Sequence, residues 1–139
     1  MNLVEGKWTG FYEYGLGYEL PYFGQRVKFS VELTLENGNI HGISKEEKSA
    51  YYVNADAKIE GYEDEDFTSF IKTYPVYPFI DENKEIQSKK GKLVICHTGI
   101  IDEEKNTMYG SWFIQDKNAV QGYECEGIWL LVKSLGDFN

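Results

Sequence analysis

With 139 residues, the chain is long enough for one hydrophobic core, and we expect a single domain over residues 1–139. Its 14 lysine and arginine residues against 23 aspartate and glutamate residues give a net charge of −9. Nucleic-acid phosphates and anionic lipid surfaces both attract basic proteins, so this balance excludes nucleic acid and the membrane surface as expected partners.

Alternating apolar and polar residues predict β-strands along the whole chain, and a content of 16% aromatic residues favours the same structure. The clearest strand covers residues 27–36, where every second residue is apolar. The pair Asn37-Gly38 then predicts a tight hairpin turn, because both residue types tolerate a positive φ. The eight expected strands span residues 5–14, 27–36, 39–44, 54–62, 67–74, 92–101, 107–115 and 124–133.

The connections between these strands alternate in length. The short ones cover residues 37–38, 63–66 and 102–106, and the long ones cover residues 15–25, 45–52, 75–91 and 116–123. In an up-and-down barrel every second connection lies at the same end, so all the long connections would share one rim. The sequence therefore predicts an all-β fold, an eight-stranded antiparallel up-and-down barrel with one elaborated mouth. One short helix is expected at 81–88.

Four short motifs spread over the chain carry a family resemblance: Gly6-Lys7-Trp8, Asn37-Gly38-Asn39-Ile40-His41-Gly42, Gly110-Ser111-Trp112 and Gly127-Ile128-Trp129-Leu130-Leu131. Together they resemble the calycin barrels (the lipocalin-like and streptavidin-like proteins), with the avidin and streptavidin branch nearest in pattern. The resemblance implies that Trp8 lies low in the barrel, that Trp112 forms part of a ligand wall and that Tyr12 faces the ligand. The third strand offers Gly42 and Ser44 without the tyrosine–serine pairing of biotin binders, so biotin is not the expected ligand.

The long connections are rich in aromatic residues. They hold six of the chain's 11 tyrosines, which are Tyr18, Tyr22, Tyr51, Tyr52, Tyr77 and Tyr123, together with Phe23 and Phe79. Tyrosine combines an apolar face with a hydroxyl, which suits recognition, although the same rings could instead pack together and order the loops. The residues expected to contact a small apolar or planar ligand are Tyr12, Tyr22, Phe29, Tyr77, His97, Trp112 and Trp129.

Motifs of catalysis and cofactor binding are missing from the sequence. It contains no nucleophile elbow, phosphate-binding glycine loop, dinucleotide fingerprint or zinc-type spacing, so neither a cofactor nor a metal is expected. His97 is a candidate proton carrier, but a structurally satisfied histidine explains it as well, and its strand face is ambiguous. Lys72 and Tyr74 could act on a bound ligand, or equally lie on the surface. Cys96 and Cys125 are expected as reduced, buried thiols.

The function expected first is binding of a small apolar or planar molecule at the mouth. One alternative is an acidic protein-binding module, of the inhibitor or immunity type, with a packed interior. The other is an isomerase-like or cyclase-like enzyme that uses His97. No signal peptide or apolar run of membrane-spanning length is visible, which favours the cytoplasm. Apolar outer positions on the last three strands are compatible with a homodimer.

Overall fold

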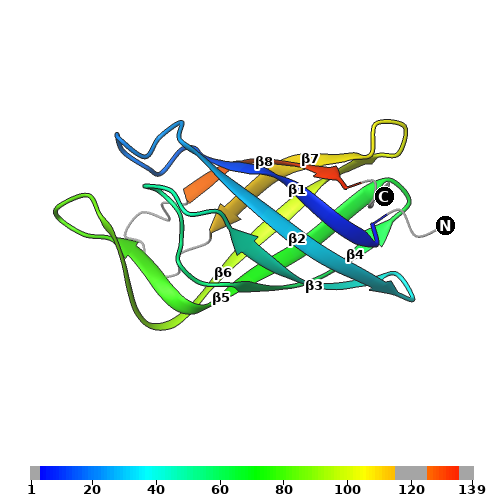
Figure 1. Cartoon of the computed structure of the whole chain (residues 1–139), viewed down its shortest axis with the longest axis horizontal. Coiled ribbons are helices and arrows are strands. Elements are labelled where there is room, and N and C mark those ends of the chain that lie inside the picture. The colour runs from blue at the N-terminus through cyan, green and yellow to red at the C-terminus, as the bar shows by residue number, and fades with distance from the viewer. Residues whose placement is uncertain (1–3, 115–124, 135–139) are drawn as a thin grey trace, which may run out of the picture.

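The structure is a computed structural model that describes residues 4–114 and 125–134, and within them eight antiparallel strands close into one barrel (Figure 1). Consecutive strands are hydrogen-bonded neighbours, and the last pairs back with the first. The predicted all-β, up-and-down barrel is therefore confirmed, and it is consistent with a calycin-type barrel in general. The strands are β1 (Gly6–Tyr14), β2 (Arg26–Glu36), β3 (Asn39–Glu46), β4 (Ala57–Asp64), β5 (Phe67–Ile80), β6 (Ile86–Asp102), β7 (Thr107–Ile114) and β8 (Cys125–Lys133).

The two ends of the barrel differ, as the alternation of connections predicted. The brief β2–β3, β4–β5 and β6–β7 turns lie at one end, which we call the closed end (Figure 1). The β1–β2, β3–β4 and β5–β6 connections lie together at the other end, which we call the mouth. Asn37 and Gly38 have φ values of 53° and 82°, so the predicted hairpin turn is confirmed. Residues 116–123, the last expected long connection, fall outside the described residues.

The segment 75–91 is not a loop, and the short helix expected at 81–88 is a wrong prediction. Strand β5 continues to Ile80 and β6 begins at Ile86, and these two residues are paired. A turn over residues 81–85 joins them, closed by the carboxylate of Asp81, which accepts the backbone N–H groups of Asn83 and Glu85 at 2.8 and 3.0 Å. Aspartate commonly closes a turn in this way, and the residues expected to form the helix are divided between this turn and strand β6.

Prolines explain why the sequence pattern ended β5 too early. Pro75 lies where the β5–β6 register shifts between Tyr74 and Val76, and Pro78 pairs in the ladder beyond it. The pairing of β4 with β5 stops at Thr73, so the extension has a neighbour on one side only. Proline lacks an N–H, and it is tolerated at bulges and on such unpaired edges. The result is a long β5–β6 hairpin that projects at the mouth (Figure 1).

Apolar side chains fill the interior toward the closed end. Trp8, Ile40, Ile59, Met108 and Leu131 are each exposed by 1% or less. The indole N–H of Trp8 donates to the carbonyl of Val4 at 2.7 Å, so its one polar atom is satisfied. This half of the barrel is a packed core of the kind expected for a small eight-stranded barrel.

Inward-facing glycines give two of the interior tryptophans, Trp112 and Trp129, their space. A Cβ on Gly127 would lie 2.5 Å from the indole of Trp112, and a Cβ on Gly99 would lie 2.7 Å from the indole of Trp129. Neither contact is possible for a real side chain, and each Cβ would also lie too close to a backbone carbonyl of the neighbouring strand, that of Glu13 or of Tyr109, so a larger residue would displace both the ring and the strand. Gly127, from one of the Gly-x-Trp motifs, and Gly99, which lies outside these motifs, thus act through packing.

The outer face of β5 to β8 carries several exposed apolar side chains, among them Ile71, Val94, Ile100, Tyr109 and Ile128. This agrees with the apolar outer positions noted in the sequence, and the homodimer stays a prediction. Across the described part of the chain, the structure has no helix that is both long and apolar enough to cross a membrane.

Candidate functional site

A cavity of about 380 Å³ opens at the mouth of the barrel. Aliphatic side chains of β6 and β7 form much of its wall, including Leu93, Ile95 and Ile114. The β1–β2 connection contributes Tyr18, and the extended hairpin contributes Tyr77. The volume lies at the lower end of the range of about 300–1,000 Å³ that ligand pockets span, and a mostly apolar lining with few polar groups is typical of them.

The inner end of the cavity is its polar part. Four lining residues lie farther from the mouth along their strands than the other residues that line it: Tyr12 on β1, Lys72 on β5, His97 on β6 and Trp112 on β7. All four are at least nine-tenths buried. A ligand that fills the cavity would therefore meet apolar walls along its length and these groups at its inner tip.

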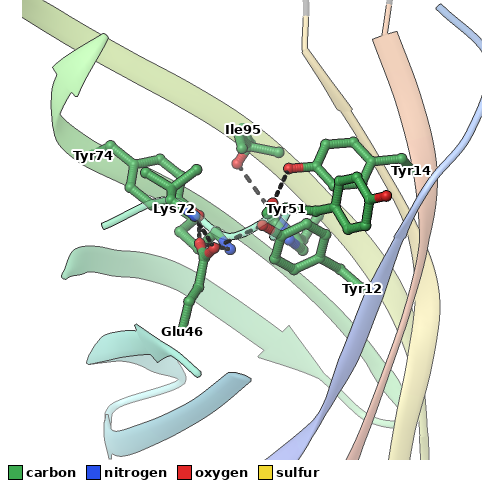
Figure 2. A network of polar contacts seen from close by, with 9 residues as sticks. Tyr12, Tyr14, Glu46, Tyr51, Lys72, Tyr74 and Ile95 are labelled. Carbon is green, nitrogen blue, oxygen red and sulfur yellow. Dashed lines mark hydrogen bonds and ion pairs between the residues drawn. The ribbon is translucent and has the colours of Figure 1, made fainter. Parts of the chain in front are cut away.

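A buried carboxylate organises this inner end. Glu46, at the last position of β3, accepts hydrogen bonds from the hydroxyl of Tyr12 at 2.7 Å and from the backbone N–H of Val53 at 2.7 Å. The hydroxyl of Tyr74 donates to its other oxygen. The ammonium of Lys72 lies 3.8 Å from the same oxygen, and both charged side chains are exposed by 2% or less. Figure 2 shows the four side chains converging from β1, β3 and β5.

Lys72 is a charged group in an aromatic environment. Its nitrogen lies 4.7 Å from the ring centroid of Tyr12, 4.9 Å from that of Phe29 and 5.1 Å from that of Tyr74. Burial lowers the pKa of the Lys72 amine, and the charge of Glu46 offsets part of that effect. Removing an ammonium from water disfavours its charged form, so more of the neutral amine is present than on an exposed lysine.

The tyrosine hydroxyls of the cluster remain protonated donors. Burial raises the pKa of Tyr12 and of Tyr74 well above the ordinary value, and the negative charge of Glu46 raises both further. A protonated phenol donates its hydrogen bond, which is what the carboxylate of Glu46 requires. Because three donors and one cation surround it, the carboxylate is satisfied inside the barrel, as a buried charge must be.

His97 faces the interior, which settles the face left open by the sequence. Its ring stacks on Phe70, with centroids 4.6 Å apart, and lies edge-on to Trp129. Burial lowers the pKa of His97 well below its usual range, and the charge of Lys72 lowers it further. Its Nδ1 lies 3.4 Å from the carbonyl of Ile95, which can only accept. His97 is thus a neutral imidazole at the inner end of the cavity.

Trp112 brings an unused hydrogen-bond donor to the site. Within the described part of the chain its buried indole N–H has no hydrogen-bond partner, although the residue lines the cavity. Trp129 differs in this respect, because its indole N–H donates to the carbonyls of Thr98 and Ser111 at 3.2 and 3.0 Å. Buried donors are rarely left unpaired, and those that are often belong to functional sites.

The mouth tyrosines divide between lining and packing. Tyr14 is central, with its ring edge-on to Tyr18 at 4.7 Å and to Tyr22 at 5.4 Å. Hydroxyl groups tie the connections together, from Tyr14 to the carbonyl of Tyr51 at 2.6 Å and from Tyr22 to the carbonyl of Lys84 at 2.9 Å. Some tyrosines therefore order the mouth and others line the cavity, and their use in recognition stays a prediction.

The structure brings four of the seven expected ligand residues to the cavity, namely Tyr12, Tyr77, His97 and Trp112. The other three, Tyr22, Phe29 and Trp129, are buried in the surrounding core and do not line it. Trp8 lies low in the barrel, toward the closed end, as the family resemblance implied.

Glu46 is the residue of the candidate site that the sequence analysis missed, because the third strand was expected to end at Ser44. The inward positions of β3 are Ile40, Gly42 and Ser44, and continuing that alternation by two residues reaches Glu46. Lys72 was noted without a face. A lysine and a glutamate at inward-facing positions would have predicted a buried ion pair, but the sequence did not show that the third strand extends to Glu46.

Other chemistry at the mouth is sparse. Cys96 and Cys125 are half-buried rather than buried, and Cys125 lines the cavity. In residues 4–114 and 125–134 there is no group of three or more histidine, cysteine or acidic side chains able to hold a metal ion. Comparison of the chain with protein-family models, with curated proteins and with solved structures finds no match.

Proposed function

We propose that the protein binds a small, largely apolar molecule in the cavity at the mouth, with a hydrogen-bond acceptor of the ligand at the inner end. The observation that carries this proposal is the cavity of about 380 Å³, walled by aliphatic and aromatic side chains and ending on Tyr12, Lys72, His97 and Trp112. Burying apolar ligand surface against such walls contributes about 25 cal/mol per Å².

The polar groups at the inner end of the cavity narrow the chemical class of ligand that we propose. The charge of Lys72 is already balanced by Glu46, so a ligand carboxylate would have to compete with a buried partner at 3.8 Å. The N–H of Trp112 has no partner among the described residues and favours a neutral acceptor such as a carbonyl oxygen. We therefore favour an uncharged ligand with one carbonyl or ether oxygen over a fatty acid.

Two residues link this proposal to the avidin and streptavidin branch, whose sequence pattern the chain resembles. Tyr12 and Trp112 were the residues that the resemblance would place beside a ligand, and both line the cavity. Gly42 and Ser44 stand on the inward row of β3 where biotin binders have their tyrosine–serine pairing, and Glu46 with its buried lysine follows them. A ligand other than biotin fits this arrangement better.

A binding assay with a filled-cavity variant tests the proposal. The apolar fluorescent probe N-phenyl-1-naphthylamine should bind the native protein with one site per chain and gain fluorescence. In Leu93→Trp the new ring would occupy the cavity, since Leu93 lines it, and we expect affinity to fall by about tenfold or more.

The neighbouring residue supplies the matched control. Val94 points outward and is exposed, so Val94→Trp adds the same ring on the same strand outside the cavity and should leave binding unchanged. No saturable binding to the native protein, or equal binding by both variants, would contradict a ligand site in the barrel.

The two alternative functions find less support. An acidic protein-binding module with a packed interior does not require a cavity at the mouth. An enzyme using His97 would need a proton acceptor or donor beside it, and in the described residues its one polar partner is the carbonyl of Ile95. Ligand binding is the function that the geometry favours.

A further inference from the structure

We infer that Lys72 forms a Schiff base with an aldehyde or ketone ligand, so that the barrel captures carbonyl compounds covalently and reversibly. This inference rests on the proposed function, because the ligand must first enter the cavity. It names the chemical class of the ligand, an apolar carbonyl compound, and assigns the reacting atom of the protein, the Nζ of Lys72.

The surroundings of Lys72 are those that activate an amine. Lys72 is exposed by 1%, lines the cavity, and has its Nζ over the rings of Tyr12, Phe29 and Tyr74. Its contact with Glu46 at 3.8 Å is longer than a hydrogen bond of about 2.7–3.2 Å, so the amine is paired electrostatically without being held in a short bond. Lysines desolvated in apolar pockets are the ones that act as nucleophiles toward carbonyl groups.

The inner end also offers groups that would orient a carbonyl. The N–H of Trp112 is an unpartnered donor within the described residues, and a carbonyl oxygen is the acceptor that it lacks. Trp112 and the nitrogen of Lys72 both pack against Tyr12, at 6.1 Å between the ring centroids and 4.7 Å from nitrogen to centroid. A carbonyl placed between them would accept from Trp112 and present its carbon to the amine.

The reaction needs no other reactant. The neutral amine adds to the carbonyl carbon, a C–N bond forms, and the carbonyl π electrons move to oxygen, which takes a proton from nitrogen. The resulting hydroxyl leaves as water with the second amine proton, which the carboxylate of Glu46, 3.8 Å from the nitrogen, accepts and passes to the leaving oxygen, and a C=N bond remains. When the imine is protonated, its positive charge stands beside Glu46 where the ammonium stood, so the buried ion pair is preserved.

Reductive trapping on the native protein tests this directly. The protein is incubated with 2-naphthaldehyde and sodium cyanoborohydride, and the reduced adduct is located by peptide mass mapping. We expect one adduct per chain, with Lys72 labelled about tenfold or more faster than any exposed lysine, because among the lysines of residues 4–114 and 125–134 Lys72 alone is both desolvated and inside the cavity. Labelling confined to exposed lysines, with Lys72 unmodified, would overturn the inference.

A non-reactive analogue separates this inference from the proposed function. 2-Naphthalenemethanol has the same ring system but cannot form an imine, and its binding is measured by the shift in thermal midpoint. If the alcohol binds while the aldehyde leaves Lys72 unlabelled, covalent capture is wrong and the binding site stands. If the alcohol does not bind and Lys72 is not labelled, both proposals fail for planar ligands.

Two variants complete the design. Lys72→Met removes the amine at nearly constant length and should abolish the cavity adduct, whereas Lys92→Met removes an exposed lysine of β6 and should leave it unchanged. If Lys72→Met does not fold, the mapping on the native protein still decides the question, because it identifies the labelled residue without a variant.

Discussion

The closed end and the mouth are two halves of one set of strands, yet their interiors differ in kind. At the closed end, side chains such as Ile40, Met108 and Leu131 are completely buried and apolar. Toward the mouth, the same inward rows carry the buried pair Glu46 and Lys72, with a cavity beside it. The closed end is stabilised mainly by apolar packing, whereas the mouth also depends on a buried ion pair and its hydrogen bonds.

This difference indicates where stability and function reside. A packed apolar core offers a ligand neither space nor a polar anchor, and its stability changes little with pH. A buried polar cluster is costly unless every member has its partner, so its retention beside a cavity favours a functional role for it. The four predictions below contrast the two halves, and they are given in order of expected effect.

Breaking the buried ion pair should have the largest effect. Glu46→Leu leaves the ammonium of Lys72 buried without its partner, and we expect a loss of about 3–5 kcal/mol in the free energy of unfolding by denaturant titration. The double variant Glu46→Leu with Lys72→Met should recover most of it, because no unpaired charge remains.

An exposed pair provides the control for this experiment. Lys58 and Glu60 form an ion pair of 2.8 Å on the outside of β4, and Glu60→Leu should leave the unfolding midpoint unchanged. If Glu46→Leu is as stable as the native protein, the cluster is not the determinant of the mouth that we describe.

A leucine-to-alanine substitution should lower the free energy of unfolding by different amounts at the closed end and at the mouth. Leu131 is completely buried in the packed end, so Leu131→Ala opens a new void and should lose about 3 kcal/mol. Leu93 lines the existing cavity, so Leu93→Ala only enlarges it and should lose about 1 kcal/mol. Equal losses in chemical denaturation would mean that the cavity walls are as tightly packed as the core.

Substitution by phenylalanine should lower the free energy of unfolding by different amounts at Trp129 and at Trp112. Trp129→Phe removes an N–H that donates to two carbonyls, and we expect a loss of about 2 kcal/mol in thermal or chemical unfolding. Trp112→Phe removes a donor with no partner among the described residues, so the loss should stay below about 1 kcal/mol. A larger loss for Trp112→Phe would show that its N–H is satisfied in the free protein.

Acidification should weaken the protein through His97. Its pKa is lowered in the folded state by burial and by the charge of Lys72, and is about 6.5 when unfolded. As the pH falls below about 6.5, His97 becomes protonated in the unfolded chain but stays neutral in the folded one. The free energy of unfolding that this difference contributes is therefore present above that pH and is lost below it. We expect a loss of about 2 kcal/mol from this group between pH 7 and pH 5.

A comparison of variants isolates the contribution of His97. His97→Gln removes the titrating ring and should give a shallower dependence of the unfolding free energy on pH. His41→Gln, at the exposed second histidine, is the matched control for exchanging a histidine for glutamine. Identical slopes for the native protein and His97→Gln would show that His97 takes up its proton in the folded state as readily as in the unfolded one.

Much of the barrel was predictable because its signals are local. The alternation in β2 places Val27, Phe29 and Val31 inward, and Asn37-Gly38 adopts the positive φ values that its turn requires. The extension of β5 was not predictable, because Pro75 and Pro78 normally end a strand. They are tolerated here since a register shift and a single neighbouring strand remove the need for their N–H groups, and both conditions are properties of the sheet.

The sequence by itself determined the eight strands, their antiparallel order and the gathering of the elaborated connections at one mouth, because period-two patterns and turn residues act over a few neighbouring positions. Only the tertiary structure decided what the mouth contains. Glu46 meets Tyr12 and Tyr74 from 34 and 28 residues away along the chain, and Lys72 reaches it from β5, with β4 between their two strands. Whether a lone lysine in a strand points inward depends on such a distant carboxylate, since burial without a partner is too unfavourable.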